Sequence, residues 1–127
     1  IWCDPDFADW PLGERAVMQA LNEWAGSGRK LTLLAEQYDA VLRKHARFVT
    51  WRGTWAHVIL RRKSGAASAG CLPSALWSPA WVFERLDIAR CTGVASADTA
   101  RCNAVKERLN EHLLASSSGF PATILGL

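Results

Sequence analysis

A cationic segment rich in tryptophan contains the side chains best suited to binding an anion. Residues 40–83 hold seven lysines and arginines and no carboxylate, whereas residues 1–39 hold seven carboxylates and three cations. Lysine and arginine attract phosphate groups, and an indole ring offers a surface on which a nucleobase stacks. In a helix, Lys44, Arg47 and Trp51 would share one face, and arginines further along could add paired hydrogen bonds to an anion. The candidate anion-binding residues are Lys44, Arg47, Trp51, Arg52, Arg61 and Arg62.

A second interpretation of the same segment is structural, and we favour it. Tryptophans close to an apolar helical stripe are ordinary core residues. A basic stretch in a single sequence is weakly specific for a ligand. Its arginines would then lie along the surface or pair with the acidic first third of the chain. Under this interpretation the segment forms no binding site.

The residue patterns of common hydrolytic and metal-dependent enzymes do not occur in the sequence. His45, His57 and His112 are present without a G-x-S-x-G elbow or an HExxH pair. The four cysteines include no CxxC pair, and there is no Walker A or GxGxxG motif. We therefore expect no catalytic residue, no metal and no cofactor. His45 falls on an apolar helical face, so we expect it to be a hydrogen-bonded core residue.

Three aspartates, Asp4, Asp6 and Asp9, surround Pro5 at the end of the first expected strand. Carboxylates at the end of a strand often carry chemistry in α/β proteins. No Gly-rich phosphate loop accompanies them here. We therefore predict turn and capping roles, with Asp9 as a possible cap of the first helix.

Apolar periodicity and turn residues predict strands that alternate with helices in the first half, then clustered strands before a last helix. The expected helices are Glu14–Ala25, Glu36–Arg52, which breaks at Gly53, and a last helix that is capped by Asp98 or Thr99 and ends at Ala115. The expected strands are Ile1–Asp4, Lys30–Ala35, Ala56–Arg61, Ala75–Ser78, Trp81–Leu86 and Cys91–Ser96. This order predicts one α/β domain over residues 1–127, with a mixed sheet packed against about three helices.

The rest of the chain predicts a mobile loop and a docked tail. Lys63–Gly70 is small and polar, as in a mobile loop, and Phe120–Leu127 is apolar enough to dock on the domain or on a partner. No run approaches the ~18 apolar residues of a membrane span, so we expect no membrane partner. With no sign of secretion, the cysteines are expected to be reduced thiols in a cytoplasmic protein.

The segment Leu31–Arg61 resembles the core of phospholipase-D-like domains that have lost catalysis. The likeness lies in an apolar strand, a helix carrying His45 and Arg47, and the strand His57–Leu60. The later strands and last helix are laid out similarly to the rest of such a half. The chain is also similar to small bacterial proteins that share the stretches Phe7-Ala-Asp-Trp-Pro-Leu, Ala46-Arg-Phe-Val-Thr-Trp-Arg and Gly119-Phe-Pro-Ala-Thr.

The HxKxxxxD motif of the active phospholipase-D-like family is absent from this sequence. Arg47 follows His45 two positions on, but Arg52 occupies the place of the motif's aspartate. No catalytic residue is therefore carried over. The resemblance implies an α/β half-domain and a tendency to pair with another half, hence a homodimer.

Two functions are predicted from the sequence ahead of a third, a degenerate phosphoesterase that uses His45 or His57. The first is a non-catalytic α/β domain that mediates protein association, including self-association, through its apolar tail or its tryptophan-rich surface. The alternative is a module that binds an anion or nucleic acid through residues 40–83.

Overall fold

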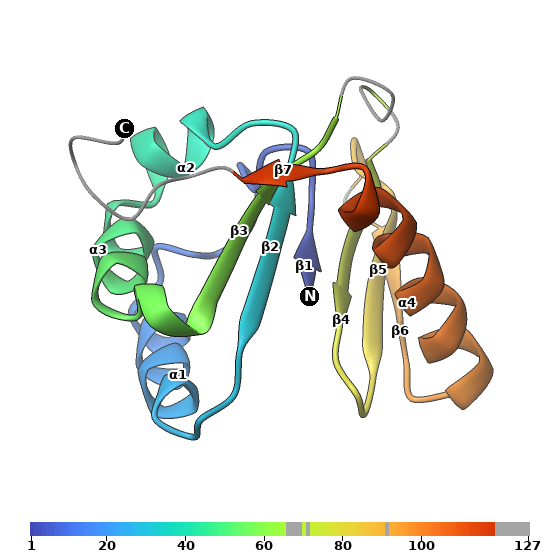
Figure 1. Cartoon of the computed structure of the whole chain (residues 1–127), viewed down its shortest axis with the longest axis horizontal. Helices are drawn as coiled ribbons and strands as arrows, with labels where there is room; N and C mark the ends of the chain where they lie inside the picture. The colour runs from blue at the N-terminus through green and yellow to red at the C-terminus, as the bar shows by residue number, and fades with distance from the viewer. Residues whose placement is uncertain (66–69, 71, 91, 119–127) are drawn as a thin grey trace.

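The computed structural model describes residues 1–65, 70, 72–90 and 92–118, and shows an α/β fold (Figure 1). The described part contains a seven-stranded mixed sheet in the order β6-β5-β4-β1-β2-β3-β7. Its strands are β1 (Trp2–Cys3), β2 (Leu31–Ala35), β3 (Ile59–Lys63), β4 (Ser74–Trp77), β5 (Val82–Asp87), β6 (Thr92–Ser96) and β7 (Ser117–Ser118). Its helices are α1 (Arg15–Ala25), α2 (Asp39–Lys44), α3 (Ala46–Thr54) and α4 (Thr99–Leu114), with the 3₁₀ turn η1 (Ala56–Val58).

The sheet changes from parallel to antiparallel pairing at its centre. Strands β1, β2 and β3 are parallel, because helical crossovers carry the chain back between them. Strand β4 is antiparallel to β1, and β4, β5 and β6 follow one another as antiparallel neighbours. A tight turn joins β4 to β5, in which the Ser78 amide donates to the Trp81 carbonyl at 3.0 Å. The mixed sheet predicted from the sequence is confirmed.

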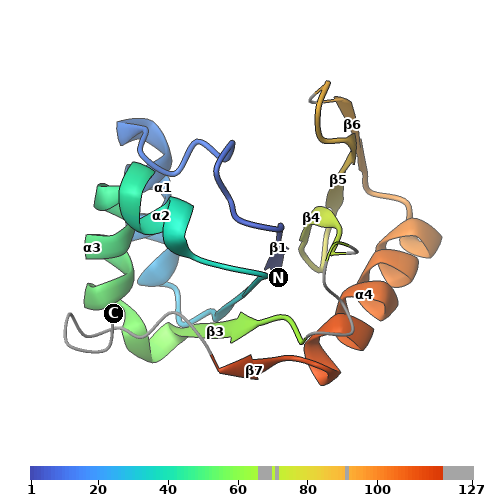
Figure 2. The same cartoon turned by 90° about the horizontal axis from the view of Figure 1, so that it is seen from above.

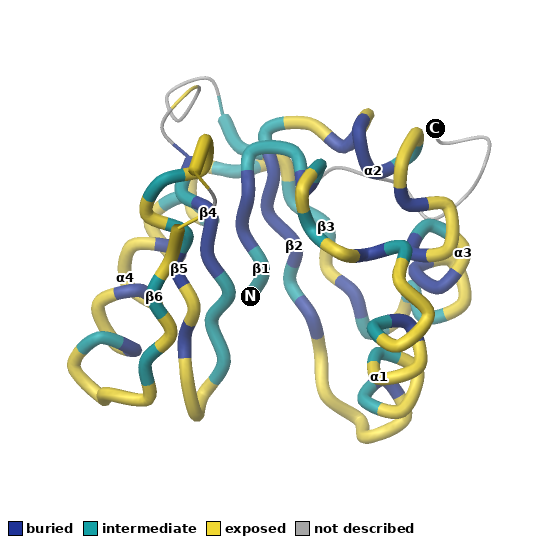
Figure 3. The backbone as a smooth tube through the Cα atoms, turned by 180° about the vertical axis from the view of Figure 1, so that it is seen from behind, coloured by how far each residue is buried: buried dark blue, intermediate teal, exposed yellow. Residues whose placement is uncertain are grey.

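Helices cover opposite faces of the two halves of the sheet (Figures 1 and 2). Helices α1, α2 and α3 lie on one face over β1–β3, and α4 lies on the other face. Alternation along the strands explains this, because successive side chains point to opposite faces. Leu33 joins the core under α1–α3, whereas Leu34 joins the core under α4. Figure 3 shows buried segments along the central strands, which both cores share.

Ion pairs hold α4 against β5. Glu84 of β5 is 8% exposed and accepts from Arg101 at 2.8 Å and from Arg108 at 2.6 Å, both on α4. The predicted cap of this helix is confirmed, because the Asp98 side chain accepts from the Arg101 amide at 3.0 Å. The α4 side of β4 and β5 is therefore occupied, while no helix covers their opposite face in the described part of the chain.

The prediction of one helix over Glu36–Arg52 is wrong. The chain forms two helices, α2 and α3, which meet at His45, so the described residues form four helices rather than about three. His45 leaves helical geometry at φ −122° and ψ 54°, and its buried ring lies 2.8 Å from the Phe7 carbonyl oxygen. A contact 38 residues away in the sequence therefore sets the break. Gly53 lies inside α3 and does not end it.

Other boundaries move by a few residues. The expected strand Ala56–Arg61 begins as the turn η1, and its strand portion is displaced to Ile59–Lys63. Glu14 rather than Asp9 occupies the N-cap position of helix α1, without a side-chain cap bond, and Asp9 instead pairs with Arg85. The tail Phe120–Leu127 and the middle of the loop Lys63–Gly70 lie outside the described residues, so those predictions stay open. In the described ranges, no helix has the length and apolar character needed to cross a membrane.

Candidate functional site: an aromatic groove beside the sheet

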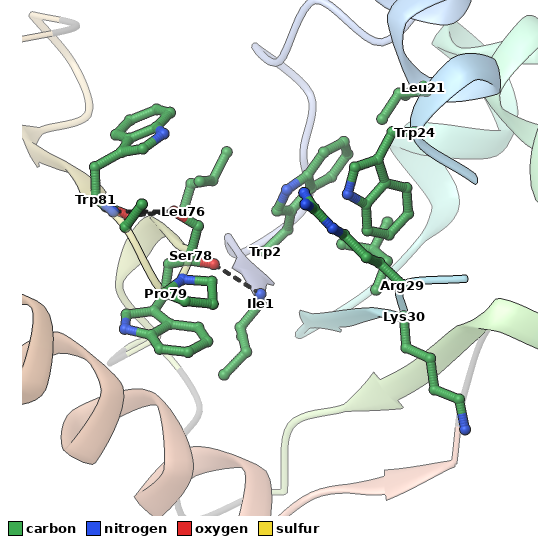
Figure 4. A pocket seen from close by; sticks show the side chains of 13 residues that line it. Ile1, Trp2, Leu21, Trp24, Arg29, Lys30, Leu76, Ser78, Pro79 and Trp81 are labelled. Carbon is green, nitrogen blue, oxygen red and sulfur yellow. Dashed lines mark hydrogen bonds between the residues drawn. The ribbon is translucent and has the colours of Figure 1, made fainter. Parts of the chain in front are cut away.

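A groove of about 820 Å³ runs beside the centre of the sheet, between the α1 side and the β4–β5 turn (Figure 4). We call it the aromatic groove, and its apolar lining residues are Ile1, Trp2, Leu21, Trp24, Leu31, Leu76, Trp77, Pro79, Ala80 and Trp81. A smaller hollow of about 340 Å³ shares Leu76 and Trp81 with it and adds Trp10, Pro11 and Phe83. Both volumes lie within the range of roughly 300–1,000 Å³ that is usual for ligand-binding clefts, and the smaller one is near its lower end.

The groove exists because the two halves of the sheet are covered on opposite faces. Trp2 pairs with Leu76 across β1 and β4, and Leu76 pairs with Phe83 across β4 and β5, so these three side chains share one face. That face is the one α4 does not cover. Trp24 of α1 forms the opposite wall, and Figure 4 shows Trp2 and Trp24 on one side with Leu76 and Trp81 on the other.

Aromatic contacts hold the inner wall in place. The rings of Trp2 and Trp10 lie 5.5 Å apart, and Trp2 stacks on Phe48 at 6.1 Å. Phe7, fully buried, meets Trp10 edge to face at 4.8 Å. Ring pairs at these separations are favourable beyond simple area burial. The indole of Trp2 is therefore positioned before any ligand arrives.

The charge of the groove is positive. Arg29 and Lys30, both exposed, line it next to the start of β2, and no carboxylate is among its 13 described lining residues. Figure 4 shows the Arg29 side chain extending alongside Trp2 and Trp24, whereas the Lys30 side chain extends away from these indoles. A flat cation beside indole rings suits a ligand that carries both a negative charge and an apolar or aromatic group.

A buried ion pair fixes the wall of the smaller hollow. Arg85 reaches Asp4 at 3.0 Å, Asp9 at 3.3 Å and the Ser74 hydroxyl at 3.2 Å. Asp4 is 1% exposed and also accepts from the amides of Asp6 and Phe7. The predicted turn role of the N-terminal aspartates is confirmed for Asp4 and Asp6, whose carboxylates accept from amides two or three residues on.

The six candidate anion-binding residues are divided between the surface and the interior. Lys44 and Arg47 are exposed on α2 and α3, and Arg47 donates to the Gly13 carbonyl at 3.1 Å. Trp51 is 4% exposed and belongs to the core under α1–α3, so its ring offers no surface for stacking in this conformation. None of the six lines the aromatic groove.

The other three arginines of the set, Arg52, Arg61 and Arg62, are engaged by the fold. Arg52 is 1% exposed, and burial together with the neighbouring Arg61 charge lowers its pKa to about 10. Arg61 donates to the carbonyls of Ala56 and Ile59, and Arg62 donates to the Ser116 hydroxyl at 2.9 Å. Arg52 and Arg61 lie close enough for their charges to interact. The anion-binding role of the six stays a prediction.

The groups that could have served catalysis have structural partners. The His45 ring is 6% exposed and bonded to the Phe7 carbonyl, as expected for a core histidine. Cys3 is fully buried, and burial followed by the nearby Asp4 charge raises its thiol pKa to about 12, so it stays protonated at neutral pH. Within the described residues, no three histidine, cysteine or acidic side chains are grouped so as to hold a metal ion.

The groove residues were missed by sequence reasoning because they come from separate elements. Trp2, Trp24 and Trp81 lie on β1, on α1 and after β4. Arg29 and Lys30 stand outside the cationic segment 40–83. The one local signal was the pair Arg29-Lys30 placed between a glycine-containing turn and an apolar strand.

Comparison with known protein families, curated proteins and solved structures found no match to this chain.

Proposed function

We propose that this chain is a non-catalytic α/β domain that mediates protein association, and that its aromatic groove binds an apolar, acidic segment of a partner protein. The observation that carries the proposal is the composition of the groove. Four tryptophans and several aliphatic side chains line the groove together with Arg29 and Lys30, and no carboxylate is among the described lining residues.

The indoles support a protein partner because they are typical anchors of protein interfaces. Trp and Arg dominate binding energy at interfaces, and a few such residues carry most of it. Trp81 is 43% exposed, and Trp2 and Trp24 are partly buried against the core, so the groove offers ring surface on rigid supports. Rigid walls reduce the entropy lost on binding.

The charge distribution favours an acidic segment over a nucleic acid. Proteins that bind single-stranded nucleic acid contact several phosphates along a positively charged groove. The groove has two described cations, whereas Lys44 and Arg47 lie on α2 and α3 and do not line it. One or two carboxylates flanked by apolar side chains match this composition better.

We also propose, from the sequence resemblance, that the domain is a phospholipase-D-like half, and that it resides in the cytoplasm. The order strand, helices, strand from β2 through β3 supports the first proposal. Free buried thiols at Cys3 and Cys102 support the second.

Binding of synthetic peptides tests the proposed partner chemistry. Eight-residue peptides that alternate leucine or phenylalanine with glutamate are compared by calorimetry with the same peptides carrying lysine in place of glutamate. We expect the glutamate peptides to bind at least about tenfold more tightly, because the groove is cationic. Equal affinity for both peptide sets, or no binding of either, contradicts the proposal.

Matched variants locate the binding. Trp81→Ala and Arg29→Glu should each weaken the affinity for the glutamate peptide by about tenfold, because Trp81 is an anchor ring and Arg29 is the cation beside the indoles. Leu114→Ala, which truncates an 88% exposed side chain on α4, and Lys44→Glu, on α2, should leave affinity unchanged. A salt-sensitive affinity for oligo(dT) that is lost in Lys44→Glu, without peptide binding, would instead support the anion-binding alternative.

A further inference from the structure

Strand β6 forms one edge of the described sheet, and no charged residue or proline within it blocks pairing, although its ladder with β5 shifts register between Arg85 and Asp87. Its sequence, Thr92-Gly-Val-Ala-Ser96, contains no charge and no proline. Natural edge strands are commonly blocked by lysine, proline, a bulge or a very short length. The opposite edge, β7, is only two residues long. An edge five residues long without charge or proline is a template for another strand.

Exposed apolar side chains surround this edge. Phe83 and Leu86 of β5 are 36% and 65% exposed, and Ile88 of the β5–β6 hairpin is 41% exposed. Ala95 of β6 is exposed opposite Phe83. Large exposed hydrophobic residues gathered in one region indicate an interaction surface.

We propose that β6 pairs antiparallel with β6 of a second copy of this chain, with the two-fold axis at Val94, so that the two sheets become continuous. In this register Thr92 lies opposite the partner's Ser96, and Gly93 lies opposite the partner's Ala95. The contact is isologous, as most dimer interfaces are. It uses a different surface from the aromatic groove and does not depend on the proposed function.

The bounds of β6 and the charges at its two ends support this arrangement. Val94 is the middle of the five residues of β6, so a two-fold axis there pairs the whole strand with its copy. Arg90 lies in the hairpin turn before β6, and Asp98, the N-cap of α4, follows it. The antiparallel contact therefore brings the turn of one copy, with its 83% exposed Arg90 side chain, to the end of the strand that precedes the partner's Asp98, and this pairing of opposite charges occurs twice.

The size of the contact predicts a weak dimer. A strand edge of five residues buries less area than the ~1,600 Å² of a standard interface. We therefore expect a dissociation constant of micromolar order or weaker, measured by sedimentation equilibrium across roughly 5–500 μM protein.

A charge reversal tests the register. Arg90→Glu would place two like-charged pairs across the dimer, so we expect the dissociation constant to rise at least about tenfold. Arg15→Glu makes the same change in net charge at an exposed position on α1, away from β6, and should leave the constant unchanged. Unfolding curves of the Arg90→Glu monomer control for damage to the hairpin. If both variants shift dimerisation equally, the register is overturned.

A cross-link tests the two-fold axis directly. With Cys71 and Cys91 replaced by serine, Val94→Cys should form an intermolecular disulfide on mild oxidation, because directly opposed side chains bring their Cβ atoms within about 5.5 Å. Ala95→Cys should cross-link far less, because in this register its partner copy lies diagonally at about 7–8 Å. A monomer at every concentration, or a dimer in which Val94→Cys does not cross-link more than Ala95→Cys, overturns the proposal. Peptide binding in the groove can succeed or fail independently of either result.

Discussion

The buried pair between Asp4 and Arg85 should contribute more to stability than any exposed ion pair described in this fold. Asp4 is 1% exposed, and the Arg85 side chain is 9% exposed. The two groups join the start of the chain to β5, 81 positions apart in sequence. Removing one partner of a buried pair leaves an uncompensated charge, which is more costly than losing the attraction itself.

The structure sets the size of the effect. Asp4→Asn would present an amide to Arg85, which would keep Asp9 at 3.3 Å and the Ser74 hydroxyl at 3.2 Å. Because those contacts remain, we expect the free energy of unfolding to fall by about 2–4 kcal/mol, toward the lower end of what breaking a buried ion pair usually costs. Arg85→Met should cost less, about 1–3 kcal/mol, since Asp4 would still accept from the Asp6 and Phe7 amides.

A double-mutant cycle isolates the interaction. Urea unfolding, followed by the fluorescence of the seven tryptophans, gives the free energy of unfolding for the parent, both single variants and the double variant. We expect the double variant to lose at least about 1 kcal/mol less than the sum of the singles, since removing both charges leaves neither one uncompensated.

The control makes the same aspartate-to-asparagine change in an exposed pair. Asp87→Asn removes the ion pair with Arg90. The Asp87 and Arg90 side chains are 43% and 83% exposed, so the free energy of unfolding should fall by under about 0.5 kcal/mol. If the losses at Asp4 and Arg85 add within about 0.5 kcal/mol, or if Asp4→Asn costs no more than Asp87→Asn, the argument from burial is refuted.

Three further predictions concern single residues. Cys3 has a pKa raised from 9.0 to about 12 by burial first and the Asp4 charge second, so the unfolded thiol ionises before the folded one. The stability contributed by the protonated Cys3 thiol is complete below pH 9 and falls by up to about 1.4 kcal/mol per pH unit as pH rises toward 12. In urea unfolding, the free energy of unfolding of Cys3→Ala should therefore decline less steeply with alkaline pH than that of the parent. Gly93→Ala should destabilise by about 1–3 kcal/mol in the same assay, because the added Cβ would lie 2.6 Å from the Glu84 carbonyl oxygen, whereas Gly26→Ala meets nothing closer than 3.7 Å. Asp98→Ala should cost about 1 kcal/mol by removing the cap of α4, and Asp98→Asn should cost less because its amide oxygen still accepts from the Arg101 amide.

Local patterns predicted the elements whose causes are local. The apolar run at Leu31–Ala35 is a buried strand with a core on each side, as a run without polar alternation indicates. The cap at Asp98 was found because it acts on an amide three residues away. The break at His45 was not found, because the group that bonds its ring belongs to Phe7, 38 residues earlier. Tertiary contacts of this kind override helical periodicity.

The candidate site could not be predicted, because the strand order creates it. Strand β1 lies between β4 and β2, so Trp2 faces both Leu76 and the α1 side, although the first residues of the chain are remote from both in sequence. The spacing of Lys44, Arg47 and Trp51 in the sequence predicts that they share one helical face, because it takes only neighbouring residues into account. The fold separates that face, since packing the large ring of Trp51 into the core stabilises the structure more than its exposure would. Trp81 stays exposed, because α4 covers only the other face of β4 and β5 and so provides no apolar partner for its ring. Which tryptophans are core and which are surface was thus decided by where the helices lie on the sheet.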